Sequence, residues 1–122
     1  MTEEVSLSDD AACILVRSTG EPSLAEMRRT LASIADLRRQ YGIARILVDS
    51  RARTSQPSIP DLHEGGELLA EMLGGEPRIA ILVGEIAAGH VFFENVTFVR
   101  GSVVAYFQDY DKALRWLAAG TE

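Results

Sequence analysis

Four short apolar runs, separated by segments long enough to form helices, constrain the fold of this chain most strongly. The runs cover residues 12–16, 46–48, 79–83 and 103–107. Parallel strands need connections of about a dozen residues or more, which are usually helical. Run 79–83 is apolar throughout, as expected of a central strand covered on both faces. The pattern predicts an α/β domain with one mostly parallel sheet flanked by helices.

An additional strand is expected at the N-terminus. Val5-Ser6-Leu7 alternates between apolar and polar residues, and Asp9-Asp10 supplies turn chemistry before run 12–16. This spacing is typical of a hairpin. We therefore expect an antiparallel strand at the N-terminal edge of the sheet.

The segment 23–41 predicts a helix from its periodicity and from both of its ends. Its apolar residues recur at spacings of three and four. Ser23 and Glu26 match a capping box, in which each side chain binds the backbone of the other residue. Gly42 suits the left-handed position that often follows the last residue of a helix.

Three more helices complete the predicted order β-β-α-β-α-β-α-β-α. One is expected over 61–73, where Asp61 and Glu64 repeat the capping signature, and one begins after Asp109. Residues 87–99 are ambiguous, because their phenylalanines and valines also favour a strand. We interpret 87–99 as a crossover helix, since the interval before Gly101 suits one.

The composition is that of a single domain, spanning residues 1–122. The chain is 47% hydrophobic and 25% charged, as in ordinary globular proteins. No apolar run approaches the ~20 residues that span a bilayer, and the acidic N-terminus lacks the features of a signal peptide. Cys13 is the single cysteine, so no disulfide is expected. We expect a cytoplasmic protein without a membrane partner.

The charge distribution is uneven. A net charge of −6 argues against binding to nucleic acid, because attraction to phosphates needs a basic face. Residues 28–53, however, contain seven arginines and two aspartates, a local charge of +5. This segment is either a solvated helix face with its following loop, or a local site for an anion or an acidic partner.

The polar stretch after run 46–48 is the predicted functional site. The run stops at Asp49-Ser50, and a mostly polar stretch of ten further residues precedes Asp61. We call residues 50–60 the 50–60 loop. Sites in α/β domains lie just beyond the carboxyl ends of strands. Arginine forks suit carboxylate or phosphate, and phosphorylation of a hydroxyl would add about −1.5 to −2 charges. The candidate residues are Asp49, Ser50, Arg51, Arg53, Thr54, Ser55 and Ser58.

The motifs of common enzymes and metal sites are not matched. Gly84 and Gly89 are followed by His90-Val91, so the lysine and hydroxyl of a phosphate-binding P-loop are missing. His90 and Glu94 stand four apart, but a metal site normally needs three or four ligands. We therefore predict no catalytic residue, no metal and no cofactor.

As a whole, the pattern resembles the STAS superfamily, and within it the small SpoIIAA-like bacterial domains. The most specific elements are Asp49 at the end of the second core strand and the closing segment Phe107 to Leu117. The resemblance covers nearly the whole chain. It implies a right-handed β-α superhelix without a cofactor that acts as a regulatory or protein-interaction module and not as an enzyme.

The resemblance also implies a phosphorylation site, with a departure from the usual pattern. In the anti-sigma antagonists of the superfamily, a serine after the Asp-ending strand is phosphorylated at a helix N-terminus. Ser50 follows Asp49 directly, but Arg51-Ala52-Arg53 replaces the expected small Ser/Thr-Gly continuation. Thr54, Ser55 or Ser58 could take the place of Ser50.

Two functions remain open from the sequence. One is an interaction module that binds a protein partner or a second copy of itself. The other is a binder of a small anionic or lipid-like ligand, held between the 50–60 loop and residues 85–93. A contiguous apolar cavity under the loop would favour the ligand binder, and a flat exposed patch would favour the module.

Overall fold

The computed structural model describes residues 3–8, 13–21, 23–53, 59–73, 77–84 and 103–119. This part of the chain forms one sheet in which the strands lie in the order in which they occur along the chain. β1 is antiparallel to β2, and every other neighbouring pair is parallel. The predicted sheet, with its antiparallel N-terminal edge, is therefore confirmed. The strands are β1 (Glu3–Leu7), β2 (Ile14–Gly20), β3 (Arg45–Arg53), β4 (Arg78–Leu82) and β5 (Val103–Phe107).

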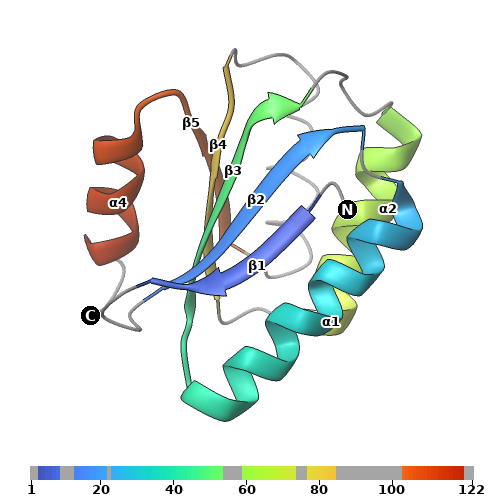
Figure 1. The fold of residues 1–122 in the computed structure, drawn as a ribbon, viewed down its shortest axis with the longest axis horizontal. Coiled ribbons are helices and arrows are strands. Elements are labelled where there is room, and N and C mark those ends of the chain that lie inside the picture. The colour runs from blue at the N-terminus through green and yellow to red at the C-terminus, as the bar shows by residue number, and fades with distance from the viewer. Residues whose placement is uncertain are drawn as a thin grey trace.

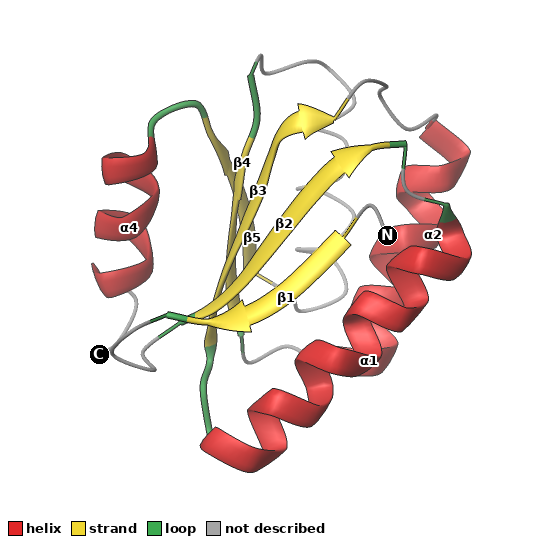
Figure 2. Ribbon diagram, in the orientation of Figure 1, coloured by secondary structure: helices red, strands yellow, loops and turns green. Residues whose placement is uncertain are grey.

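Helices cover both faces of the sheet (Figure 1). Helices α1 (Leu24–Tyr41) and α2 (Ile59–Leu73) lie against one face, and α4 (Tyr110–Ala119) lies against the other (Figure 2). α4 packs on β3, β4 and β5. This layered arrangement places the carboxyl ends of the parallel strands along one edge of the sheet.

The ends of α1 are capped as the sequence predicts. The backbone N–H of Glu26 donates to the Ser23 Oγ over 3.2 Å, and the Ser23 N–H donates to Glu26 Oε1 over 3.5 Å. At the other end, Gly42 has a φ of 67° and its N–H donates to the carbonyl of Arg38. These contacts satisfy backbone groups that a helix terminus leaves unpaired.

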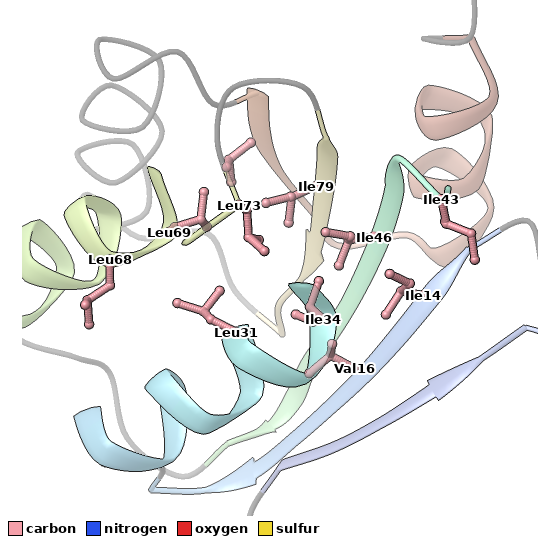
Figure 3. Close-up of a cluster of buried hydrophobic side chains, with 11 residues drawn as sticks. Ile14, Val16, Leu31, Ile34, Ile43, Ile46, Leu68, Leu69, Leu73 and Ile79 are labelled. Carbon is pink, nitrogen blue, oxygen red and sulfur yellow. The ribbon is translucent and has the colours of Figure 1, made fainter. Parts of the chain in front are cut away.

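Two hydrophobic clusters hold the helices against the sheet. Under α1 and α2, the larger cluster joins Leu31 and Ile34 to strand residues such as Ile14 and Ile46 (Figure 3). The smaller cluster lies under α4 and contains Leu47, Ala80, Leu82, Ala113 and Leu117. Burial of apolar surface at about 25 cal/mol per Å² is the main force that keeps such layers together.

Arg78 adds a polar anchor for α4. Its guanidinium carbon lies 3.9 Å from the centre of the Trp116 ring, and its Nη2 donates to the Trp116 carbonyl over 3.0 Å. The Trp116 ring also packs at an angle against Phe107, with the ring centres 5.6 Å apart. The closing segment 107–117 is therefore fixed to the sheet by aromatic and cation–π contacts.

Three predicted boundaries are wrong, and in each case the strand or helix is longer than predicted. β2 continues to Gly20 instead of ending at residue 16, β3 continues to Arg53 instead of Asp49, and α2 begins at Ile59 instead of Asp61. The two strands extend together, because their ends pair with each other up to Gly20 and Arg53. Backbone pairing needs no apolar side chain, so the polar composition of these ends hid them.

These changes shorten the predicted 50–60 loop. Residues 50–53 belong to β3, and residues 54–58 lie outside the described residues. The predicted crossover helix over 87–99 also lies outside them.

Candidate interaction site at the carboxyl end of β3

A β-bulge shapes the end of β3. The register of β2 and β3 shifts by one residue just beyond the pair of Arg17 and Asp49. Two residues of β3, Ser50 and Arg51, therefore lie opposite one residue of β2, Ser18. A bulge leaves a backbone group of the longer strand without its place in the ladder of hydrogen bonds.

The Asp49 side chain provides the missing partner. Its Oδ1 accepts hydrogen bonds from the backbone N–H of Arg51 over 3.1 Å and from the Arg51 Nε over 3.0 Å. Its Oδ2 accepts from the Arg51 Nη2 over 2.9 Å. One carboxylate thus stabilises the bulge and also holds the guanidinium in a bidentate pair, the strongest geometry for such a contact.

The pair changes the acid–base properties of both side chains. The hydrogen bond from Arg51 lowers the pKa of Asp49, although partial burial of the carboxyl opposes this effect, and Arg17 lowers it further. The pKa of Arg51 is raised, chiefly by Asp49 and to a smaller extent by Tyr110. The Asp49 carboxylate therefore stays ionised to a lower pH than an unpaired aspartate would.

Arg17 and Tyr110 complete the surface around this pair. Arg17 is exposed and lies beside Asp49 in the neighbouring strand. Tyr110, at the start of α4, is 43% exposed and contributes the smallest of the electrostatic effects that raise the pKa of Arg51. We call Arg17, Asp49, Arg51 and Tyr110 the β3-end patch. Two strands, β2 and β3, and the helix α4 contribute to it, so only the folded chain brings these side chains together.

The other predicted site residues have different positions. Ser50 and Arg53 are half-buried in β3, while Thr54, Ser55 and Ser58 lie outside the described residues. Within the described residues, the buried Nε of Arg53 and the buried Oγ of Ser18 in β2 have no hydrogen-bond partner. Buried polar atoms without partners are rare in folded proteins, and a bound water, an ion or local strain explains those that occur.

The sequence predicted Asp49 and Arg51 as residues of one site, but it did not predict Arg17 and Tyr110 there. Arg17 was missed because β2 was expected to end one residue earlier. An arginine within a strand that alternates buried and exposed positions was the available signal. Tyr110 directly follows Asp109, the residue that caps α4 by accepting from the Lys112 N–H. An aromatic residue at that position, one residue past the cap, could have been expected near the sheet edge.

Two negative findings concern only the described part of the chain. It contains no group of three histidine, cysteine, aspartate or glutamate residues that could hold a metal ion. None of its helices is both long enough and apolar enough to cross a membrane. The predicted ligand position between the 50–60 loop and residues 85–93 depends on segments outside the described residues.

Comparison with known proteins assigns the fold. No model of a protein family matches the chain, and no curated protein matches it. A solved structure from Shewanella loihica PV-4, an uncharacterised protein of the DUF3478 family with a SpoIIAA-like fold, is similar with a TM-score of 0.62. The two chains are 16% identical, and the likeness covers 94% of this chain and 91% of that chain.

The protein therefore has a SpoIIAA-like fold, and the resemblance seen in the sequence is confirmed at that level. The order and direction of the strands and the placement of helices on both faces agree with this assignment. At this identity the likeness establishes the fold alone, and the activity must be argued from the surface of the chain itself.

Replacing Asp49 tests the structural part of the site. Asp49→Ala removes the acceptor for the bulge N–H and the charge, and should lower the free energy of unfolding by about 1.5 kcal/mol. Asp49→Asn keeps an oxygen for that N–H and should cost only about 0.5 kcal/mol, since exposure of the pair (33% for Asp49, 47% for Arg51) weakens the charge effect. Chemical denaturation measures both values.

The pH dependence separates the charge from the hydrogen bond. Because the folded pKa of Asp49 is lowered, its ionised form stabilises the fold above the pKa of the unfolded carboxyl. This contribution is lost as the pH falls through the folded pKa, so the difference between wild type and Asp49→Asn should vanish in acid. Asp36→Ala is the control, because the Asp36–Arg39 pair on α1 is far more exposed. Equal effects of Asp49→Ala and Asp36→Ala would contradict the assignment.

Proposed function

We propose that this protein is a non-catalytic interaction module that binds an acidic surface of a protein partner through the β3-end patch. The observation that carries the proposal is the state of Arg51, which is held by two side-chain hydrogen bonds to Asp49 and is still 47% exposed. A side chain that is already fixed loses little conformational entropy when it binds. The patch thus presents a pre-organised guanidinium to a partner.

The residue types and the charge of the surface support a protein partner. Arginine and tyrosine are enriched among the residues that contribute most binding energy at protein interfaces. Arg17, Arg51 and the nearby Arg53 outnumber Asp49 in a chain whose net charge is −6. A locally basic patch on an acidic protein favours an acidic partner surface, which a second copy of this chain could also provide.

Phosphorylation would regulate this binding through the same charges. Ser50 is half-buried in β3, whereas Thr54 and Ser55 follow Arg53 directly in the sequence, with Ser58 a few residues further on. A phosphate on any of them would add about −1.5 to −2 charges beside the arginines and repel an acidic partner. It would also compete with Asp49 for Arg51. We therefore include phosphorylation in the proposal as an off-switch.

A small anionic ligand is the second candidate function. The observation that favours it is that Arg53 Nε and Ser18 Oγ, on the adjacent strands β3 and β2, are buried and have no hydrogen-bond partner among the described residues. An anion could accept from both groups. Native mass spectrometry of the protein purified from its own host distinguishes the candidates, because a retained small mass indicates a ligand and a retained chain indicates a partner.

An affinity purification from host lysate tests the main proposal. Arg17→Ala with Arg51→Ala and Arg53→Ala should lower recovery of the principal partner by about tenfold or more, because rim and core charges both contribute to binding. The matched control removes three exposed arginines outside the patch, with Arg28→Ala, Arg39→Ala and Arg115→Ala. Equal recovery with the two triple variants, at intact fold by circular dichroism, would contradict the proposal.

A further inference from the structure

A groove lies on the opposite side of the molecule from α4, between β1 and α1. It has a volume of about 640 Å³ and is lined by Glu3, Glu4 and Val5 of β1 and by one stripe of α1 that runs from Glu26 to Leu37. Thr30 Oγ1 donates to Glu3 Oε1 over 2.7 Å and joins the two walls at one point. The groove therefore has two walls of different secondary structure that are joined at one point.

The β1 wall is also the edge of the sheet. β1 pairs with β2 on one side and is the terminal strand of the described sheet (Figure 2). The outer side of a terminal strand presents backbone N–H and C=O groups that can pair with an added strand. An extended segment bound there would direct every second side chain towards α1 and so into the groove.

The dimensions of the groove fit an extended segment of the same length as β1. The α1 stripe from Glu26 to Leu37 is about 16 Å long at 1.5 Å per helical residue. An extended chain of about five residues, at 3.2–3.4 Å each, covers the same distance. β1 itself has five residues, so an added strand could pair along its whole length while its side chains follow the helix.

The charge of the groove indicates the chemistry of that segment. Among the described lining residues, Glu3, Glu4, Glu26 and Asp36 are acidic and Arg29 is basic. Asp36 is partly neutralised by its pair with Arg39, which leaves an excess of negative charge. β1 of a second copy contains two glutamates and no basic residue, so it would not complement these carboxylates. Lysine or arginine side chains would.

We propose that the outer edge of β1, the terminal strand of the described sheet, and this acidic groove bind an extended basic segment of another protein by strand addition. Backbone pairing with β1 supplies affinity, and alternate basic side chains reach the carboxylates between β1 and α1. This surface differs from the β3-end patch in position and in sign of charge. The inference stands whether or not the β3-end patch binds a partner.

Fluorescence anisotropy with a labelled synthetic peptide, Lys-Val-Lys-Val-Lys-Val-Lys with blocked ends, tests the proposal. Saturable binding is expected, together with chemical-shift changes at the backbone amides of residues 3–7. The same peptide with glutamate in place of lysine should bind at least about tenfold more weakly, because its charges repel the groove. Two further peptides carry N-methyl groups on the odd-numbered or on the even-numbered backbone nitrogens. Only one of them should lose binding, since only one of these two sets of N–H groups pairs with β1.

Protein variants locate the effect. Glu3→Gln with Glu4→Gln and Glu26→Gln removes charge but keeps the oxygen atoms that accept from Thr30 and from the Ser23 N–H, so the fold should be unaffected. Binding of the basic peptide should weaken by about tenfold. The matched control, Glu21→Gln with Glu64→Gln and Glu71→Gln, removes three exposed charges outside the groove and should bind as wild type does.

Four results would overturn the proposal. The basic peptide could fail to bind saturably up to about 1 mM, or the acidic peptide could bind as tightly as the basic one. Both methylated peptides could still bind, or the two triple variants could lose the same amount of affinity for the basic peptide. Sedimentation of the protein alone provides a further check. A dimer that is broken by blocking β1 would assign the edge to a second copy and would also overturn it.

Discussion

Replacing Leu117 with alanine should lower the free energy of unfolding by about 3 kcal/mol. Leu117 is 1% exposed and lies in the cluster between α4 and the sheet, with Leu47, Ala80 and Leu82. The substitution removes the apolar contacts of the side chain and leaves a cavity that well-packed neighbours fill only in part. For a domain of this size, that loss is a large fraction of the total stability.

Arg115→Ala is the matched control for Leu117→Ala. Arg115 is exposed on the same helix, so its replacement should change the free energy of unfolding by less than about 0.5 kcal/mol. Thermal or chemical denaturation of both variants measures the difference. Equal and small effects would contradict the packing of α4 described above, and with it the position of Tyr110 in the β3-end patch.

The fold was largely predictable because its strands and helices are specified by local patterns. Runs 79–83 and 103–107 are apolar where the structure has β4 and β5, and the capping box at Ser23 marks the start of α1. These signals are strong because a covered strand must be apolar and an exposed helix end must satisfy its own backbone groups. The same logic placed the antiparallel strand β1.

The candidate site was only partly predictable, because it depends on pairing between distant segments. Nothing local to Ser50-Arg51-Ala52-Arg53 indicates a strand, since its order comes from the backbone of β2. The role of Asp49 follows from the bulge, and a register shift leaves no signal in one sequence. Arg17 and Tyr110 join the patch only through the sheet and through α4.

The role of the hydroxyl groups beyond β3 stays a prediction. Thr54, Ser55 and Ser58 lie outside the described residues, and Ser50 is held in β3. Mass spectrometry of the protein from its own host would identify the modified residue, if there is one. The charge argument predicts that a phosphate there and the triple arginine variant weaken the same interaction.

Site-specific photo-cross-linking tests the central claim most directly, that the β3-end patch is the partner-binding surface. Tyr110 and Tyr41 are the two exposed large hydrophobic side chains in the described part of the chain, at 43% and 57% exposure. They lie at different ends of the sheet, because Tyr41 ends α1 and Tyr110 begins α4 (Figure 1). Each can be replaced by benzoyl-phenylalanine with little disturbance, and Tyr41, which is the more exposed of the two, then serves as the control.

Irradiation in the host cell should give a discrete adduct at position 110 that exceeds the adduct at position 41 by about tenfold or more, since the energetically important contacts of an interface are concentrated in a small area. Adding Arg17→Ala and Arg51→Ala should remove this adduct without changing the folded fraction of the protein. Adducts of equal yield at the two positions, or an adduct at position 110 that persists without both arginines, would contradict the assignment of the β3-end patch as the binding surface.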